Sequence, residues 1–248
     1  MSAVLEAEGL VRGWGGVRAV DGVSFRLEAG EMLALIGPNG AGKSTCFNLL
    51  SGQLRPDAGR VRFQGRDITG WAPRRIWRLG VGRTFQITAT FGSMSLRDNV
   101  RLALLSHHRR IFDLWRPARQ LMAAEAEALL ARIGLADQAD RPAAYLAYGD
   151  LKRLELAMAL AHNPRLLLMD EPTAGMAPEA RQALMAETAA IARREGIAVL
   201  FTEHDMDVVF GHADRVLVLE RGRLIAEGPP AAVRADARVR QVYLGSAG

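Results

Sequence analysis

A glycine-rich loop that follows an apolar run constrains this chain more than any other feature. Residues 37–45 read GPNGAGKST, and the apolar run MLALI at 32–36 comes directly before them. Glycines let the backbone turn tightly, so that consecutive N–H groups can point inward at phosphate oxygens. The spacing G-x-x-x-x-G-K-S, after a predicted strand, therefore indicates a loop that binds a nucleoside triphosphate.

Each part of this loop has an expected task. Lys43 is expected to reach the β- and γ-phosphates, and Ser44 to bind Mg²⁺. The helix that should begin here would turn its positive end towards the same phosphates. The residues predicted to hold the nucleotide are Gly37, Pro38, Asn39, Gly40, Ala41, Gly42, Lys43, Ser44 and Thr45.

Length and composition are those of a globular protein with a full core. The 248 residues suit one large domain or two small lobes, and no apolar stretch approaches the roughly 18 residues that span a bilayer. We see no signal peptide, and the single cysteine, Cys46, fits a reducing compartment and is expected to be buried. The net charge of +5 comes from scattered arginines, which suit a solvated surface as well as contact with nucleic acid or anionic lipid.

The pattern along the chain predicts two kinds of β structure. Residues 1–30 read as short strands with turns, and residues 61–64 alternate again before a turn at 65–67. The continuous apolar runs at 166–169, 197–201 and 216–219 instead suit parallel strands that are buried on both faces. A strand is also expected to end near residues 83–86, after a helix at 73–79.

A helical lobe is expected to interrupt this α/β pattern. Helices are predicted over 96–105, beginning near Ser95, over 117–132, ending before Gly134, and over a third segment with a face formed by Leu151, Leu154, Met158 and Ala161. Further helices are predicted at 178–194 and in the tail, 229–244. The predicted fold is a P-loop (RecA-like) α/β core with an antiparallel β portion, formed by 1–92 and 163–248, and an inserted helical subdomain at 93–162.

The second chemical signal is a pair of acids at a predicted strand end. Asp170 and Glu171 follow the apolar run at 166–169. In P-loop enzymes an aspartate in this place holds Mg²⁺, and a neighbouring carboxylate can polarise the attacking water. The pair therefore favours hydrolysis over simple nucleotide binding.

Three weaker signals accompany it. Trp14, beside two glycines, suits stacking on a base or a half-buried position in a hairpin. Gly149 precedes an amphipathic helix, which makes a second anion site. His204 follows the run at 197–201 and lies at the carboxyl edge of the predicted sheet, where it could bond a γ-phosphate or serve a structural role.

Taken together, these motifs resemble the nucleotide-binding subunit of ABC transporters over almost the whole chain. Within that family the chain looks most like the ATPases of branched-chain amino-acid importers. The cues are RTFQ at 83–86, LAYG at 146–149, AGM at 174–176, EHDM at 203–206 and VYLG at 242–245.

The resemblance implies a role for each motif. Trp14 matches the aromatic residue that stacks on adenine, and Gln86 matches the glutamine that senses Mg²⁺ and water and faces the membrane partner. Glu171 matches the general base and His204 the switch histidine. Residues 146–150 match the signature loop, which closes over the ATP of a second subunit. Its contacting residues would be Ala147, Tyr148, Gly149 and Asp150.

Some positions depart from the family pattern. Ala147 replaces a serine that often contacts the γ-phosphate, and Tyr148 replaces a glycine, as in related importers. Asp150 stands where glutamine or glutamate is common, and Ala177 where aspartate or asparagine is usual. These changes bear on coupling between subunits and not on ATP binding.

The resemblance also implies ATP and Mg²⁺ as cofactors and several partners. These are a second ATPase subunit (in a homo- or heterodimer), membrane permease subunits and, indirectly, a periplasmic or extracellular solute-binding protein, with no nucleic acid. The chain would lie on the cytoplasmic face of the inner (plasma) membrane. The solute is expected to be a branched-chain or other hydrophobic amino acid. An amide, urea or aromatic-acid importer, and a regulatory or assembly ATPase, remain alternatives.

Other P-loop classes fit less well. A GTPase would need an N-K-x-D motif, which neither Lys43 nor Lys152 supplies, and a chromosome ATPase would carry a long coiled coil. A translation-associated ATPase would usually carry two such domains, and a small-molecule kinase needs neither residues 146–150 nor His204. The segment 107–117, HHRRIFDLWRP, suits either a permease-docking surface or aromatic residues folded onto the helical lobe.

Overall fold

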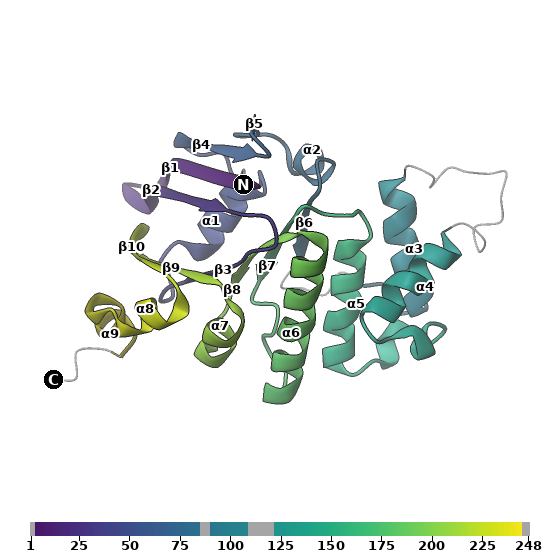
Figure 1. Cartoon of the computed structure of the whole chain (residues 1–248). Coiled ribbons are helices and arrows are strands. Elements are labelled where there is room, and N and C mark those ends of the chain that lie inside the picture. The colour runs from purple at the N-terminus through teal and green to yellow at the C-terminus, as the bar shows by residue number, and fades with distance from the viewer. Residues whose placement is uncertain (1–2, 85–89, 109–121, 245–248) are drawn as a thin grey trace.

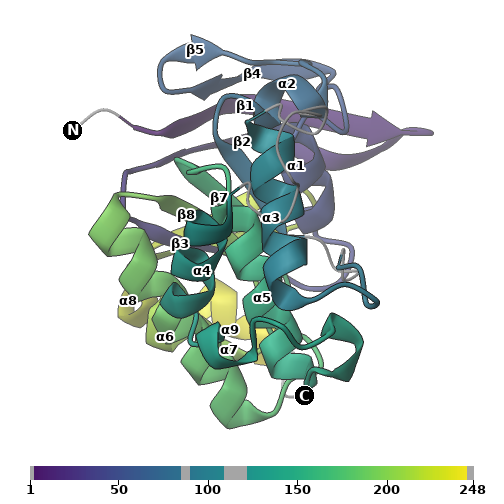
Figure 2. The same cartoon turned by 90° about the vertical axis from the view of Figure 1, so that its right-hand side faces the viewer.

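Two β-sheets and the helices around them form the molecule (Figure 1). The computed structural model describes residues 3–84, 90–108 and 122–244. The smaller sheet lies across the top of the larger one in two perpendicular views (Figures 1 and 2). No helix in these described ranges combines the length and the apolar character needed to cross a membrane.

The smaller sheet is antiparallel, in the order β2-β1-β4-β5. Its strands are β1 (Leu5–Trp14), β2 (Val17–Leu27), β4 (Ala58–Phe63) and β5 (Arg66–Asp67). Residues 5–27 thus form one long hairpin, and the expectation of short strands was wrong. Register shifts near Gly9 and Gly13 break the alternation of apolar residues, so the sequence pattern looks interrupted where the strand continues.

The larger sheet has the order β10-β9-β3-β8-β7-β6. Its strands are β3 (Met32–Ile36), β6 (Val81–Thr84), β7 (Leu166–Asp170), β8 (Ala198–Thr202), β9 (Arg215–Glu220) and β10 (Arg223–Gly228). All pairings are parallel except that of β10 with β9, so the predicted parallel strands are confirmed. Strand β10 escaped prediction because it is a half-exposed edge strand without an apolar run.

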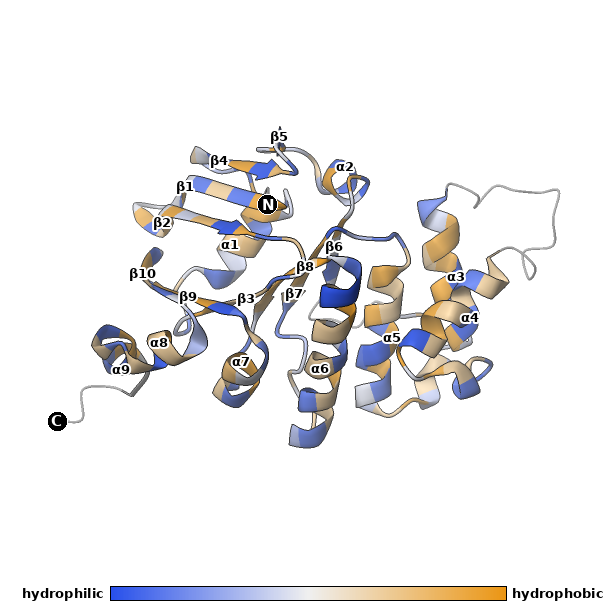
Figure 3. Cartoon of the chain, viewed as in Figure 1, coloured by the Kyte–Doolittle hydropathy of each residue, from blue (hydrophilic) through white to orange (hydrophobic). Residues whose placement is uncertain are grey.

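Both faces of the larger sheet are buried, and alternate residues enter two different cores. Leu33, Leu35 and Leu168 pack with α1 (Lys43–Leu50) and the antiparallel sheet. Ala34 and Met169 pack instead with the helices on the opposite face. Figure 3 shows the resulting hydrophobic colour on the central strands. This double burial explains why these strands are continuously apolar in the sequence.

Most of the remaining helices were predicted, in the order observed, but the helix Met206–His212 was not, and the single helical stretch predicted in the tail is two helices. The helices are α2 (Pro73–Trp77), α3 (Leu96–His107), α4 (Ala123–Arg132), α5 (Tyr148–Leu160), α6 (Pro178–Glu195), α7 (Met206–His212), α8 (Pro230–Ala235) and α9 (Ala237–Leu244), with short 3-10 turns at Ala136–Gln138 and Ala143–Tyr145. Helix α4 begins later than the predicted residue 117, because Met122 adopts a left-handed φ of 57° at its N-cap. Residues 117–121 lie outside the described ranges.

Helices α3, α4 and α5 pack on one another at one side of the molecule (Figures 1 and 2). Their apolar side chains and those of the large sheet belong to one continuous core. The division of the chain into a core and a subdomain at 93–162 stays a prediction.

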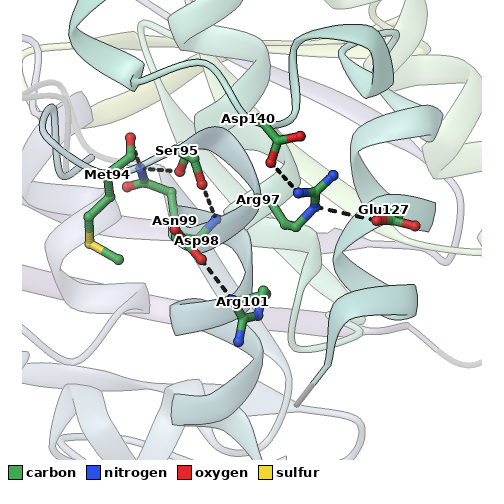
Figure 4. Close-up of polar contacts among 8 residues, drawn as sticks. All are labelled: Met94, Ser95, Arg97, Asp98, Asn99, Arg101, Glu127 and Asp140. Carbon is green, nitrogen blue, oxygen red and sulfur yellow. Dashed lines mark hydrogen bonds and ion pairs between the residues drawn. The ribbon is translucent and has the colours of Figure 1, made fainter. Parts of the chain in front are cut away.

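A buried asparagine holds the entry to this group of helices (Figure 4). Ser95 caps α3 by accepting a hydrogen bond from the N–H of Asp98, as expected for a helix that begins there. The Asn99 side chain is fully buried, accepts from the N–H of Phe91 at 2.8 Å and donates to the carbonyls of Phe91, Met94 and Ser95. One amide therefore satisfies four backbone groups of the turn before α3.

The same turn is joined to the chain that precedes α5. The N–H of Ala143 donates to the Met94 carbonyl, and the N–H of Ala144 to the Gly92 carbonyl. Arg97 forms ion pairs with Glu127 and the exposed Asp140 (Figure 4). These contacts thus hold the turn before α3 against the segment leading into α5.

We predict that Asn99→Ala lowers the free energy of unfolding by about 3 kcal/mol, because buried backbone groups of the turn lose their partner. Urea unfolding measures this change. Asp140→Ala removes only an exposed ion-pair partner and should stay within about 0.5 kcal/mol of the wild type. Equal effects of the two variants would show that the amide network contributes little.

Candidate functional site

The predicted phosphate loop connects β3 to α1. Gly40 and Gly42 have φ values of 79° and 106°, a region that favours glycine. A Cβ atom added at Gly42 would lie 2.1 Å from the carbonyl oxygen of Ala19. Position 42 therefore requires glycine, both because of its backbone conformation and because β2 approaches it closely.

Lys43 is held inside this loop. Its Nζ donates to the carbonyl oxygens of Gly37 at 2.6 Å and Pro38 at 3.1 Å. The side chain is buried, and this burial lowers the pKa of the Lys43 amine, against the opposing effect of Glu171 and Asp170. The cation therefore lies between the loop and the two predicted acids, where an incoming phosphate oxygen can replace a carbonyl acceptor.

A distant turn supports the loop from the side. The N–H of Gly222 donates to the Ala41 carbonyl at 2.9 Å, and the Gly222 carbonyl accepts from the N–H of Asp21 at 2.8 Å. Sequence reasoning did not find this support. The only local signal for it is a glycine, Gly222, shortly after the apolar run at 216–219.

The carboxyl ends of β7 and β8 bring the predicted acids and the histidine together. The Thr202 hydroxyl donates to Asp170 Oδ1 at 2.8 Å and accepts from the N–H of Glu171 at 3.0 Å. The backbone of Glu171 has a left-handed φ of 50°. Its Oε1 lies 2.8 Å from Nε2 of the half-exposed His204. The prediction had placed both residues at this edge but had given Thr202 no role.

Two further contacts hold the chain beyond these strands. The buried Glu203 accepts from the N–H and the hydroxyl of Thr173 at 2.8 and 2.7 Å. Desolvation raises the pKa of Glu203, although the bonds from Thr173 oppose this. Arg181 donates to the Met176 carbonyl and to Asp205, each at 2.7 Å. These contacts orient the segment between Glu171 and α6, and sequence reasoning had missed them.

The predicted signature loop forms the start of α5. Ala147 is its N-cap, and Ala147 and Tyr148 are exposed. The Tyr148 ring lies against Gly175, since a Cβ there would be 3.4 Å from the ring. Asp150 pairs with Arg153 at 3.3 Å. The start of α5 at 147–150 and the loop at 174–177 therefore share one partly exposed surface.

The other predicted residues lie apart from this edge or outside the described ranges. Trp14 ends β1 with 47% of its surface exposed, and the Arg12 guanidinium lies 5.0 Å from its ring centre. Gln86 and residues 109–117 are outside the described parts of the chain. Cys46 is buried as expected, and desolvation raises the pKa of its thiol to about 12.

The fold and the loop together define a P-loop nucleoside triphosphatase. A parallel sheet, a glycine-rich loop before a helix and an acid at the end of a neighbouring strand form this arrangement. The comparisons with known proteins identify the family. Residues 20–174 match the ABC transporter family model, and residues 223–248 match a model for branched-chain amino acid ATP-binding cassette transporters.

The sequence relatives agree. The chain is 37% identical to the high-affinity branched-chain amino acid transport ATP-binding protein LivG of Salmonella typhimurium, over 98% of each protein. It is 36% identical to BraF of Pseudomonas aeruginosa, again over 98% of each.

Solved structures show the same fold. The ADP conformation of an ATP-binding cassette of an ABC transporter superposes with a TM-score of 0.87 at 32% identity, covering 99% of this chain and 100% of that one. A nucleotide-free cassette gives 0.86 at 32% identity, covering 98% and 100%. The chain belongs to the family of ABC transporter ATP-binding proteins, and it is an ATPase that binds ATP.

We predict that Lys43→Ala removes most nucleotide binding or turnover, whereas Trp14→Ala weakens binding and leaves the saturating rate nearly unchanged. Lys43 meets phosphate charge, but Trp14 would meet only the base, at a cost on the order of 1–3 kcal/mol by analogy with base stacking. Fluorescent-nucleotide titration and steady-state ATPase assays separate the two effects.

Trp14→Phe, which keeps an aromatic face, is the matched control and should bind nearly as well as the wild type. A large fall in the saturating rate of Trp14→Ala, with unchanged affinity, would contradict the stacking role.

Proposed function

We propose that this chain drives the uptake of a branched-chain or other hydrophobic amino acid, as the ATPase subunit of an ABC importer. The observation that carries the proposal is the similarity to LivG and BraF over 98% of each chain, together with the match of residues 223–248. The cassette itself does not reveal the solute, because the predicted site contacts only nucleotide.

In this proposal Glu171 is the general base that accepts a proton from the attacking water. His204, whose Nε2 lies 2.8 Å from Glu171 Oε1, orients that carboxylate and can reach the γ-phosphate. Lys43 and the N–H groups of the loop at 37–45 stabilise the charge that develops on the phosphates. For Gln86, which lies outside the described parts of the chain, we propose the role of sensing Mg²⁺ and water.

Mg²⁺ fits the oxygen donors that the site offers. The Asp170 carboxylate ends β7 beside Lys43, and the Ser44 hydroxyl is exposed in the first turn of α1. Carboxylate and hydroxyl oxygens suit this hard cation, which usually keeps several waters and binds substrate phosphates. When bound, the ion would supply positive charge that neutralises the phosphate oxygens. We assign Ser44 and Asp170 as its protein ligands and Gln86 as its sensor.

A second subunit would complete each ATP site. Ala147, Tyr148, Gly149 and Asp150 start α5 beside the exposed Gly175, and the N-terminus of α5 offers N–H groups to an anion. A surface that presents such groups outward suits the nucleotide of a partner copy. ATP would then lie between two chains, in a homo- or heterodimer.

The proposed assembly also contains membrane permease subunits and, indirectly, a solute-binding protein outside the membrane. The chain would act at the cytoplasmic face of the inner membrane. The helices within 93–162, proposed as a separate subdomain, would carry the signature loop to the partner's ATP.

We predict that Glu171→Gln abolishes turnover and keeps ATP binding. The amide preserves size and can contact His204 but cannot accept the proton. With ATP the variant should accumulate as a dimer, since bound ATP joins the subunits and hydrolysis no longer removes it. Size-exclusion chromatography with and without ATP measures this, and full hydrolysis by the variant would remove Glu171 from its role.

Reconstitution tests the transport function. The permease subunits of the proposed importer should copurify with this chain and, with their binding protein, take up leucine-like amino acids in proteoliposomes when ATP is present. Amides, urea and aromatic acids are the competing solutes in the same assay. Absence of any permease partner would favour a regulatory or assembly ATPase instead.

A further inference from the structure

Arg83, in β6, lies between two parts of the nucleotide site. Its Nη1 donates to Asn48 Oδ1 at 2.9 Å and to Ser51 Oγ at 2.8 Å. Its Nη2 lies 3.7 Å from Asp170 Oδ2, and the side chains of both charged residues are largely buried. The guanidinium therefore bridges the last turn of α1 and the end of β7.

These two elements carry the two proposed Mg²⁺ ligands. Helix α1 begins with Lys43 and Ser44, and Asn48 lies in the same helix, one turn beyond Ser44. Strand β7 ends at Asp170. On the other side of that carboxylate, Thr202 Oγ1 donates to Oδ1 at 2.8 Å. The two oxygens of Asp170 thus have different partners, and one of them, Arg83, also contacts the helix of Ser44.

The physical properties of arginine suit this task. Burial lowers the pKa of the Arg83 guanidinium, and the charge of Asp170 opposes this shift. Burying a cation costs free energy unless it is paired, and Asp170 provides the charged partner. Its planar fork makes several fixed contacts at once, which a lysine cannot reproduce. Mg²⁺ demands near-ideal octahedral geometry, so small errors in ligand position weaken its binding.

We propose that Arg83 is a positioning residue for the metal, which holds the helix of Ser44 in register with the strand of Asp170. The inference rests on the proposed Mg²⁺ site and is independent of the transported solute. Residues that orient metal ligands typically contribute 10–100-fold to metal affinity.

The test is a Mg²⁺ titration of nucleotide binding by Arg83→Lys and Arg83→Met, followed with a fluorescent ATP analogue. We expect the Mg²⁺ concentration at half-saturation to rise at least about tenfold. Affinity for the analogue in EDTA should change less than about threefold, because the phosphate loop is untouched.

Arg215→Met is the matched control. Arg215 is also a largely buried arginine, but it pairs with Glu31 and Glu227, away from Asp170. The control should lower the melting temperature and leave the Mg²⁺ dependence unchanged. If Arg83→Met does not fold, Asn48→Ala provides the second variant, since it removes one anchor of the guanidinium, and it should shift the Mg²⁺ dependence in the same direction.

An unchanged Mg²⁺ half-saturation in the folded Arg83 variants, or an equal loss of affinity with and without Mg²⁺, would overturn the inference. The same experiment distinguishes failure of the Arg83 inference from failure of the proposed Mg²⁺ site. If the Mg²⁺ site itself is wrong, the wild type will bind the analogue equally well in Mg²⁺ and in EDTA.

Discussion

Burial of both faces of the parallel sheet is the constraint on which the rest of this structure depends. Because Leu33, Leu35 and Leu168 pack to one side and Ala34 and Met169 to the other, β3, β7 and β8 are held as a rigid layer. Their polar residues can then occur only where the strands end. The phosphate loop, the acids and the histidine follow those ends and share one edge of the sheet.

At this edge the site is built from charges that hold one another. The Lys43 cation lies within the phosphate loop and is attracted electrostatically by Asp170 and Glu171. Thr202 links the two acids by bonding the side chain of one and the N–H of the other. Arg83 then joins Asp170 to the phosphate-binding helix. The network orders the protein's own groups before a nucleotide arrives, which is how an enzyme avoids reorganisation during reaction.

The surface at the start of α5 fits a different requirement. Tyr148 packs on Gly175 and remains partly exposed. The start of α5 at 147–150 and the loop at 174–177 therefore form one surface within a single chain. Helix α5 in turn follows a segment that is joined to the turn held by Asn99. The turn held by Asn99 is therefore connected through backbone hydrogen bonds to the chain that leads to this surface.

The sequence by itself determined the elements whose information is local. The loop at 37–45, the acids at the end of β7 and the helix cap at Ser95 depend on neighbouring residues, so spacing and composition predicted them. Gly149, which was predicted to precede α5, lies instead in the first turn of that helix. The continuous apolar runs likewise predicted a parallel sheet. Local patterns did not predict the length of β1, which contains bulges, or the strand β10, which lacks an apolar run. They also did not predict the start of α4, which follows the left-handed Met122.

Only the tertiary structure decided which distant residues support the site. Thr202 reaches Asp170 because the register of β7 and β8 places these two residues opposite each other. Gly222 reaches the phosphate loop because β9 pairs with β3, and Arg83 reaches α1 because β6 pairs with β7. A serine, threonine, glycine or arginine looks the same in a sequence whether or not such a partner exists. The register of parallel strands, fixed by packing over the whole sheet, gives these residues their partners.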